Sequence, residues 1–183
     1  KANIKQFADS SIQKLGSLSK VGMAGLVTGF AAASKAALSY SKEMTNLANV
    51  AGVGFVEFQK LAAAAKTVGI EKDKMADILK DVNDKMGDFL ETGGGPMKDF
   101  FKNIAPAIDI TSKAFRGLSS RETLQLYYDS LKKANISQER MTFYMEALAN
   151  DATALLPLLA NNGKELRAYG DAAARAGRIM SNE

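Results

Sequence analysis

The chain has 183 residues, of which 46% are hydrophobic and 24% are charged, enough for one domain with a buried core, which we expect, and compatible with two small ones. Histidine and cysteine are absent, which excludes a Ser/His/Asp triad, a cysteine nucleophile, a disulfide framework and the usual Cys/His zinc site within these residues. The formal net charge is only +4, and no nucleic-acid-binding motif is present, so we expect no specific binding to nucleic acid. Because the chain begins at Lys1 rather than at methionine, we expect it to be part of a longer protein.

The N-terminal quarter of the chain is rich in small residues. Apolar residues at helical spacing predict an amphipathic helix from Ile4 to Leu18, and Ala31 to Leu47 continues as a small-residue helix. Residues 21–34 between them carry no charge, but the run is shorter than the roughly 20 residues that a bilayer core requires. Close helix packing through Gly25 and Gly29 is the favoured interpretation, and a membrane-active segment is the alternative.

Four predicted helix starts after Ala51 share one pattern. An apolar residue precedes the first turn and a second apolar residue follows five positions later, which is the spacing of a hydrophobic staple. Ser119 and Glu122 predict a capping box at a fifth start. So many starts predict short helices folded back on one another. The four staple pairs are Val53 with Phe58, Ile70 with Met75, Ile110 with Phe115, and Ile136 with Met141.

The stretch from Ile70 to Leu90 predicts a helix with one apolar face and one acidic face. Carboxylates one turn apart can share a hard cation, but a straight helix spreads them over several turns, whereas oxygen cages need converging ligands. We therefore interpret the acidic face as a surface for solvent or a protein partner, and we expect no metal and no cofactor. Its members are Asp73, Asp77, Asp81, Asp84 and Asp88.

The helix is predicted to end at Gly93, Gly94 and Gly95, after which Pro96 suits the first turn of a new helix. The GxxxxGK[ST] spacing of a phosphate-binding loop is missing, and no apolar strand precedes the glycines. These four residues are therefore our candidates for a hinge. The aromatic residues that follow, such as Phe100, are interpreted as core anchors.

The remaining sequence predicts helices separated by prolines, asparagines and glycine. A short helix ends before Pro106, one runs from Ser119 to Asn135, and one continues from Ser137 until Pro157. A turn is expected at 161–163. The last helix, 164–183, shows no clear stop and is expected to continue beyond the given sequence.

No stretch has the alternating pattern of a strand, so the predicted fold class is all-α. We expect several short amphipathic helices folded back on one another as a helical module, with terminal helices extending out. The predicted segments are 1–47, a small-residue-rich helical segment; 48–163, a compact multi-helix module; and 164–183, a C-terminal helix.

Several segments together resemble the tail tape measure proteins of long-tailed bacteriophages and prophages. The resemblance covers about Leu47 to Ala176, and the ordered series of segments is more specific than any one of them. The segments are LANVAG, GIEKDKMADILKDVNDKMGDFLETGGGPMKDFF, LQLYYDSL, MTFYMEALANDATALLPLL and NNGKEL.

This resemblance implies an assembly protein rather than an enzyme. Tape measure proteins are long, mostly helical chains that lie in the growing tail tube, set its length and leave through it when DNA is ejected. The implied location is the virion, inside the tail, and the host cytoplasm during assembly. The implied partners are tail tube and tail tip proteins, other copies of the chain through its helices, and the host membrane during ejection. No residue stands out as catalytic.

The sequence pattern does not fit a single continuous helix, which a uniform ruler would require. A single helix of this length would extend for about 270 Å at ~1.5 Å per residue, whereas a compact domain would have a radius of gyration near ~16 Å. Four staples and a triple glycine predict short helices that turn back. We therefore expect a folded module within a longer chain.

Overall fold

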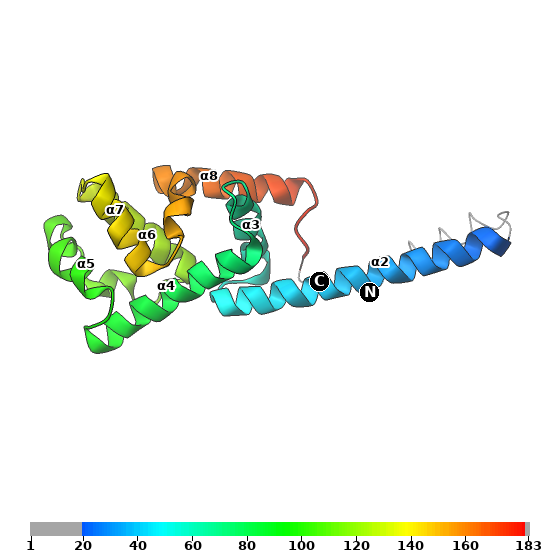
Figure 1. The fold of residues 1–183 in the computed structure, drawn as a ribbon, viewed down its shortest axis with the longest axis horizontal. Helices are drawn as coiled ribbons and strands as arrows, with labels where there is room; N and C mark the ends of the chain where they lie inside the picture. Colours follow the sequence, from blue (N-terminus) through cyan, green and yellow to red (C-terminus); the bar gives the residue numbers. More distant parts are fainter. Residues whose placement is uncertain (1–19, 182–183) are drawn as a thin grey trace. The chain divides into compact units, whose positions relative to one another are not determined.

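A computed structural model describes residues 20–181, with the surroundings of side chains from residue 35 onward. These residues form seven α-helices and three 3₁₀-helices without any strand among them, which confirms the all-α prediction (Figure 1). The helix predicted from Ile4 to Leu18 lies outside the described residues. The elements are α2 (Lys20–Ala51), α3 (Phe55–Lys66), α4 (Lys72–Thr92), α5 (Lys98–Asn103), η1 (Ala105–Ile108), η2 (Ser112–Phe115), α6 (Ser120–Lys133), α7 (Gln138–Leu148), η3 (Ala152–Leu155) and α8 (Leu156–Arg175).

The chain forms two compact units, residues 1–42 and residues 43–183. Helix α2 belongs to both, because it begins in the first unit and its last turns contribute Met44, Ala48 and Ala51 to the core of the second. None of the described helices is both long enough and apolar enough to cross a membrane. The division into 1–47, 48–163 and 164–183 stays a prediction.

The four predicted staples all mark helix starts. The residue that follows the first member of each staple pair is the N-cap of the next helix. These N-caps are Gly54 for α3, Glu71 for α4, Thr111 for η2 and Ser137 for α7. The start after Thr111 opens a single 3₁₀ turn rather than an α-helix. In each pair the second residue is buried, so the local sequence signal coincides with a contact to the core. Those second residues are Phe58, Met75, Phe115 and Met141.

The predicted capping box at the start of α6 is also present. The hydroxyl oxygen of Ser119 accepts a hydrogen bond from the backbone N–H of Glu122 at 3.3 Å. In return, the backbone N–H of Ser119 donates to Oε2 of Glu122 at 2.9 Å. This bond and the hydroxyl bond from Ser119 lower the pKa of the Glu122 carboxyl. The start of α6 is therefore defined by a local network that the sequence alone encodes.

Two helix ends differ from prediction. Helix α7 ends at Leu148 rather than continuing to Pro157, because Ala149 is extended and Asp151 has φ of 64°. Ala152 and Leu155 are buried all the same, because they lie on the following 3₁₀-helix η3. The apolar residues of this stretch therefore reach the core without a continuous α-helix. Aspartate tolerates the left-handed region better than most residues, and that property was overlooked in the sequence.

The predicted turn at 161–163 is present within α8, where Asn161, Asn162 and Gly163 all have left-handed φ. The expected continuation of the last helix was wrong. Helix α8 ends at Arg175, and Gly177 adopts φ of 68°. The backbone N–H of Arg178 then donates to the carbonyl of Ala173 at 3.0 Å, as in a Schellman ending. A single glycine after alanines and an arginine was too weak a signal to recognise as this stop.

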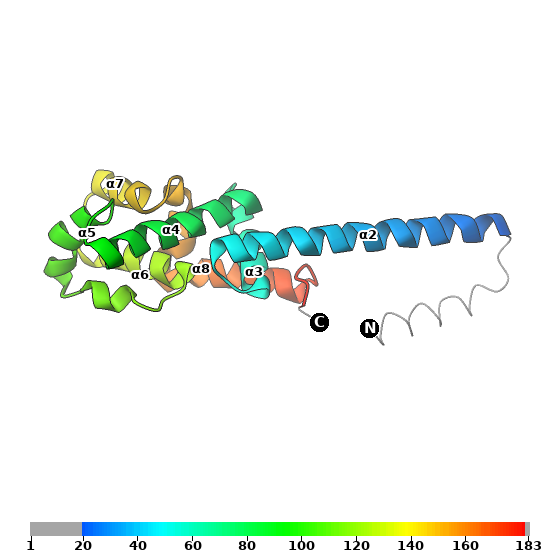
Figure 2. The ribbon, with the colours of Figure 1, turned by 90° about the horizontal axis from the view of Figure 1, so that it is seen from below.

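Within the unit 43–183, α3 packs along α8, while α4 contacts α3, α6 and α7. Figures 1 and 2 show α4 lying along one side of α6 and α7. The part of this core around α5 is aromatic. The rings of Phe89 and Phe101 are stacked with their centroids 4.0 Å apart, and the ring centroids of Phe100 and Tyr127 are 4.4 Å apart. Phe100 and Tyr127 are fully buried, which confirms Phe100 as a core anchor. The helices that carry charged surface residues are therefore fixed in position by this packed core.

Candidate functional site

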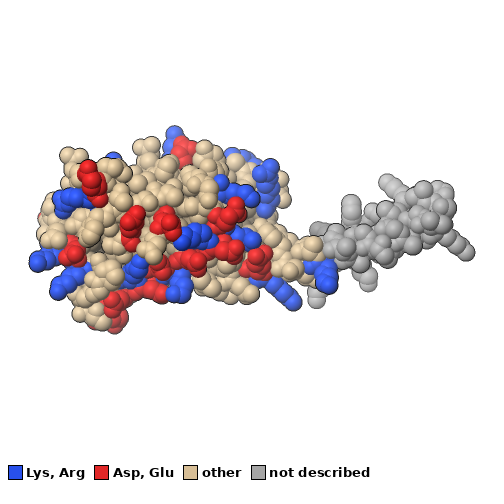
Figure 3. Space-filling model, viewed as in Figure 1, with Lys and Arg blue, Asp and Glu red and all other residues tan. Residues whose placement is uncertain are grey.

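Helix α4 separates its apolar and acidic residues as the sequence predicted. Met75, Ile78 and Val82 are buried, whereas the five aspartates on the other side are exposed or, for Asp81, half-buried. Acidic side chains lie in a row over α4 in Figure 3, with lysines among them. That a protein partner binds this row stays a prediction.

Part of the acidic row is neutralised within the chain. Lys80 pairs with Asp84 and Lys85 pairs with Asp81, the second at 3.4 Å, and both are one-turn pairs along the helix. The hydrogen bond to Asp84 raises the pKa of the Lys80 ammonium. Among the described residues Asp73, Asp77 and Asp88 form no ion pair, and two of these three unpaired carboxylates lie in the N-terminal half of the row.

The same helix does not bring its carboxylates to one point. In residues 20–181, no group of three acidic side chains is placed to hold a metal ion. Oxygen-ligand cages need carboxylates and carbonyls converging from loops, and the aspartates of α4 lie along a straight helix. The chemistry that the row offers is electrostatic attraction to a basic surface.

The glycines after α4 form an ordered turn. Gly93 has φ of 71° and its N–H donates to the carbonyl of Phe89 at 2.8 Å, which ends the helix as predicted. Gly95 has φ of 69°, and the N–H of Gly94 donates to Oγ1 of Thr92 at 3.0 Å. Left-handed backbone at two of three positions explains why glycine stands there. Whether residues 93–96 act as a hinge stays a prediction.

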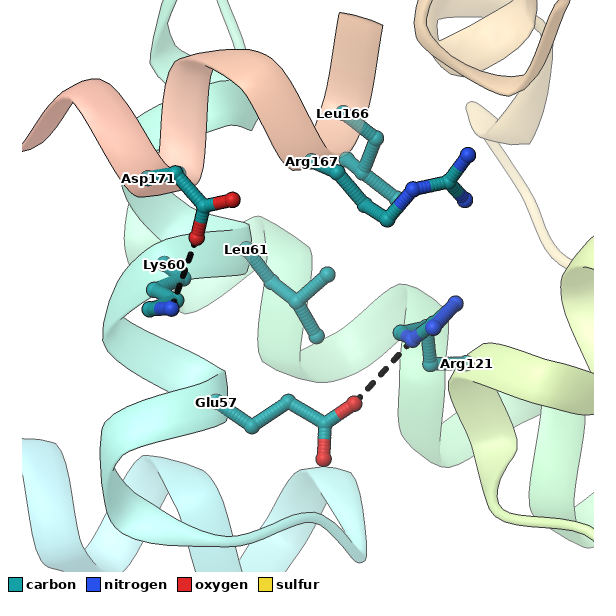
Figure 4. A pocket seen from close by; sticks show the side chains of 8 residues that line it. Glu57, Lys60, Leu61, Arg121, Leu166, Arg167 and Asp171 are labelled. Atoms are coloured by element: carbon teal, nitrogen blue, oxygen red, sulfur yellow. Dashed lines mark hydrogen bonds and ion pairs between the residues drawn. The ribbon is translucent and has the colours of Figure 1, made fainter. Parts of the chain in front are cut away.

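The described surface also contains a pocket that the sequence did not predict. It lies between α3, α6 and α8 and has a volume of about 200 Å³ (Figure 4). Two ion pairs cross it: Lys60 Nζ to Asp171 Oδ1 at 2.7 Å, and Arg121 Nε to Glu57 Oε1 at 3.1 Å. The bond from Lys60 lowers the pKa of the Asp171 carboxyl. We call this hollow the α3/α6/α8 pocket; its lining is Glu57, Lys60, Leu61, Arg121, Leu166, Arg167, Gly170 and Asp171.

The pocket was missed because its residues are distant in sequence. Lys60 and Asp171 are 111 positions apart, and Glu57 and Arg121 are 64 apart. Each of these residues, taken alone, is typical of a solvated helix surface. Only the packing of α3 and α6 against α8, with the buried Gly170 at the contact with α3, assembles them.

These three features offer charged and hydrogen-bonding groups. The acidic row offers carboxylates, the turn offers two left-handed glycines, and the pocket offers guanidinium groups over buried leucines. No protein-family model, curated protein or solved structure matches the chain.

Proposed function

We propose that this chain is a structural module of a phage tail tape measure protein. In this role it takes part in tail assembly and tail-length determination and leaves the tail when DNA is ejected. The observation that carries the proposal is the ordered series of segments between Leu47 and Ala176 that resembles this family. The all-α fold with an exposed acidic helix supports it, because such proteins work through helices and protein contacts.

The acidic row of α4 is the surface that we assign to tail partners. Asp73 and Asp77 carry exposed charge at its N-terminal half, and exposed charges steer protein association even where they add little affinity. Tail tube proteins, tail tip proteins and further copies of this chain are the proposed partners, inside the virion and, during assembly, in the host cytoplasm. The proposed role is structural and involves no reaction.

A folded module has a direct consequence for length determination. As one straight helix, residues 43–183 would extend for about 210 Å, whereas α4, the longest helix that lies wholly within this unit, extends for only about 32 Å. A module that stays folded in the tail therefore adds much less length than its residue number suggests. If it unfolds into a continuous helix on assembly, it adds the full length.

Deletion of residues 43–183 from the full-length protein in a phage that carries it tests the proposal. Electron microscopy of the tails measures the change in length, and duplication of the same residues is the matched control with the opposite sign. A folded module predicts a length change far below about 210 Å, and a ruler segment predicts a change near that value. Tails of unchanged length in both variants, with the protein absent from purified virions, would overturn the assignment to the tail.

A second candidate function is favoured by one observation: no charged residue occurs from Val21 to Ser34. An uncharged helical stretch suits insertion into the host membrane during ejection. Leakage of dye-filled liposomes measures this activity for the whole chain, and Gly25→Glu with Gly29→Glu is expected to abolish it by placing charge in the apolar stretch. An absence of leakage with the parent chain removes the membrane function for this segment.

A further inference from the structure

We propose that the α3/α6/α8 pocket binds the carboxylate side chain of a glutamate or aspartate presented by a partner protein. The pocket brings together two arginines from different helices, Arg121 on α6 and Arg167 on α8. In Figure 4 their guanidinium groups lie on the same side of the pocket, opposite the pair formed by Lys60 and Asp171. Two cations at one side of a hollow attract an anion more strongly than cations spread over a convex surface.

Only part of the hydrogen-bonding capacity of Arg121 on α6 is used. Its Nε donates to Oε1 of Glu57 at 3.1 Å, and among the described residues neither of its Nη atoms makes a hydrogen bond. Its side chain is 27% exposed, so a carboxylate bound there is partly shielded from water. Because a guanidinium presents five N–H donors in one plane, Arg121 can hold Glu57 along one edge and a second carboxylate along the other.

Arg167 on α8 forms no ion pair among the residues that the structure describes, although its charge helps to lower the pKa of the Asp171 carboxyl one turn further along the helix. Its Nη1 donates to the backbone carbonyl of Asn162, which positions the guanidinium without neutralising it. Lys60 and Asp171 neutralise each other, and Glu57 balances Arg121, so Arg167 leaves the lining with one net positive charge. A single negative charge is the complement of this lining.

The size and floor of the pocket fit one amino-acid side chain. About 200 Å³ is below the usual range for small-molecule and cofactor sites, which begins near ~300 Å³. Leu61 and Leu166 are 4% and 5% exposed and offer an apolar surface for methylene groups. Gly170 adds no side chain to the α8 wall. A glutamate therefore places its stem on the leucines and its carboxylate against the guanidinium groups.

The charge at the edge of the pocket favours a carboxylate over a phosphate. Glu57 and Asp171 both contribute carboxylates to the lining, and each repels an incoming anion. A single carboxylate neutralises the one net positive charge of the lining, whereas a doubly charged phosphate leaves one net negative charge beside Glu57 and Asp171, and a nucleic-acid backbone brings several phosphates at once. A singly charged side chain gains the two arginines at the lowest electrostatic cost.

Nuclear magnetic resonance on the whole ¹⁵N-labelled chain tests the proposal with a defined probe. The end-blocked tripeptide Gly-Glu-Gly is expected to shift the backbone signals of Leu61, Gly170 and Asp171 in a saturable manner, because its carboxylate enters the pocket. Blocked Gly-Gln-Gly, which has the same shape without the charge, is expected to leave them unchanged. Equal shifts with the glutamine peptide, or tighter binding of inorganic phosphate at the same residues, would overturn the assignment.

Variants separate pocket binding from general charge effects. Arg121→Gln and Arg167→Gln are each expected to weaken glutamate-peptide binding about tenfold, the loss of a charge-assisted hydrogen bond. Glu57→Gln removes the competing carboxylate and is expected to strengthen binding several-fold. Lys132→Gln removes one positive charge from the exposed side of the same helix α6 and is the matched control, expected to have no effect. Unchanged binding by Glu57→Gln, or an effect of Lys132→Gln equal to that of Arg121→Gln, contradicts the proposal.

Discussion

Gly170 on α8 lies directly against Lys60 on α3. A Cβ added to Gly170 would be 2.9 Å from Cβ of Lys60 and 3.1 Å from its backbone oxygen. Both neighbouring atoms are fixed to the α3 backbone, so neither can move away without shifting the helix. This contact sets the spacing of α3 and α8, and with it the shape of the α3/α6/α8 pocket.

We therefore expect Gly170→Ala to destabilise the protein by about 1–2 kcal/mol, because overpacking outweighs the higher helix propensity of alanine. Urea unfolding followed by circular dichroism measures the change in the free energy of unfolding. Gly87→Ala in α4 is the matched control, since nothing lies within 4 Å of its added Cβ. That control is expected to stabilise by up to about 1 kcal/mol. Equal stabilisation by both substitutions would show that α3 and α8 are not in close contact.

The capping box at the start of α6 predicts a pH dependence. Hydrogen bonds from Ser119 lower the pKa of the Glu122 carboxyl in the folded state, so the charged carboxylate stabilises the fold. This contribution is present above the unfolded pKa, near 4.5, and is lost as the pH falls through the lower folded value. Glu122→Gln is expected to reduce the difference in urea midpoint between pH 6 and pH 3.

The same box gives a prediction at neutral pH. Ser119→Ala removes the side-chain acceptor for the N–H of Glu122 and is expected to cost about 1 kcal/mol. Glu146→Gln, on the exposed side of α7, serves as the control for loss of a surface carboxylate in the pH experiment with Glu122→Gln. If Glu146→Gln changed the pH dependence as much as Glu122→Gln, overall charge rather than the capping box would be responsible.

The local signals of the sequence predicted the helix starts well. The staple of Ile70 with Met75 and the box of Ser119 with Glu122 join residues no more than five positions apart, so each can be recognised without knowing the fold. Contacts over long separations gave no such signal. Gln59 exchanges two hydrogen bonds with the backbone of Met180, at 3.0 and 2.9 Å, across 121 positions. Neither segment contains a sequence pattern that predicts these hydrogen bonds.

The pocket shows the same limit at the level of function. The acidic row on α4 was recognised because one helix carries all five aspartates at helical spacing. Arg121 and Arg167 lie on different helices, and only the packing of α6 and α3 against α8 brings them to one pocket. Periodicity identifies a helix face, but it does not identify which faces meet. Sites built from several helices therefore require the structure.

The buried hydroxyl of Tyr127 predicts a specific loss. It donates to the backbone carbonyl of Tyr144 at 2.9 Å and joins α6 to α7 within the core. Tyr127→Phe removes this bond between α6 and α7, although the carbonyl of Tyr144 also lies within the backbone bonding of α7, and we expect a cost of about 0.5–1.5 kcal/mol in the free energy of unfolding. Tyr169→Phe removes a hydroxyl from a side chain that is 44% exposed and is the matched control, expected to change stability by less than about 0.5 kcal/mol.

Burial also raises the pKa of the Tyr127 phenol far above its usual value of 10. The unfolded chain ionises this group near pH 10 while the folded chain keeps it neutral, so its stabilising contribution is present below pH 10 and is lost as the pH rises further. Ultraviolet titration is expected to show one tyrosine fewer in the native alkaline titration of the parent than in urea. In the Tyr127→Phe variant the native count is expected to stay the same while the count in urea falls by one; a difference between native and urea counts as large as that of the parent would contradict the assignment.

The glycine turn after α4 allows its structural and its proposed hinge roles to be separated. Gly95 has a left-handed backbone and lies against the carboxylate of Asp88, so Gly95→Ala is expected to destabilise by about 1–3 kcal/mol. Gly94→Ala is the control, because position 94 does not require a left-handed backbone and its added Cβ meets only Oγ1 of Thr92 at 3.3 Å. Urea unfolding of both variants measures the difference.

For the hinge, we expect Gly93→Ala with Gly94→Ala to impair tail assembly or infectivity in a phage that carries the protein, because alanines extend α4 and restrict the turn. Normal tails and normal infectivity, with only a stability loss in the isolated chain, would leave the turn a structural helix stop.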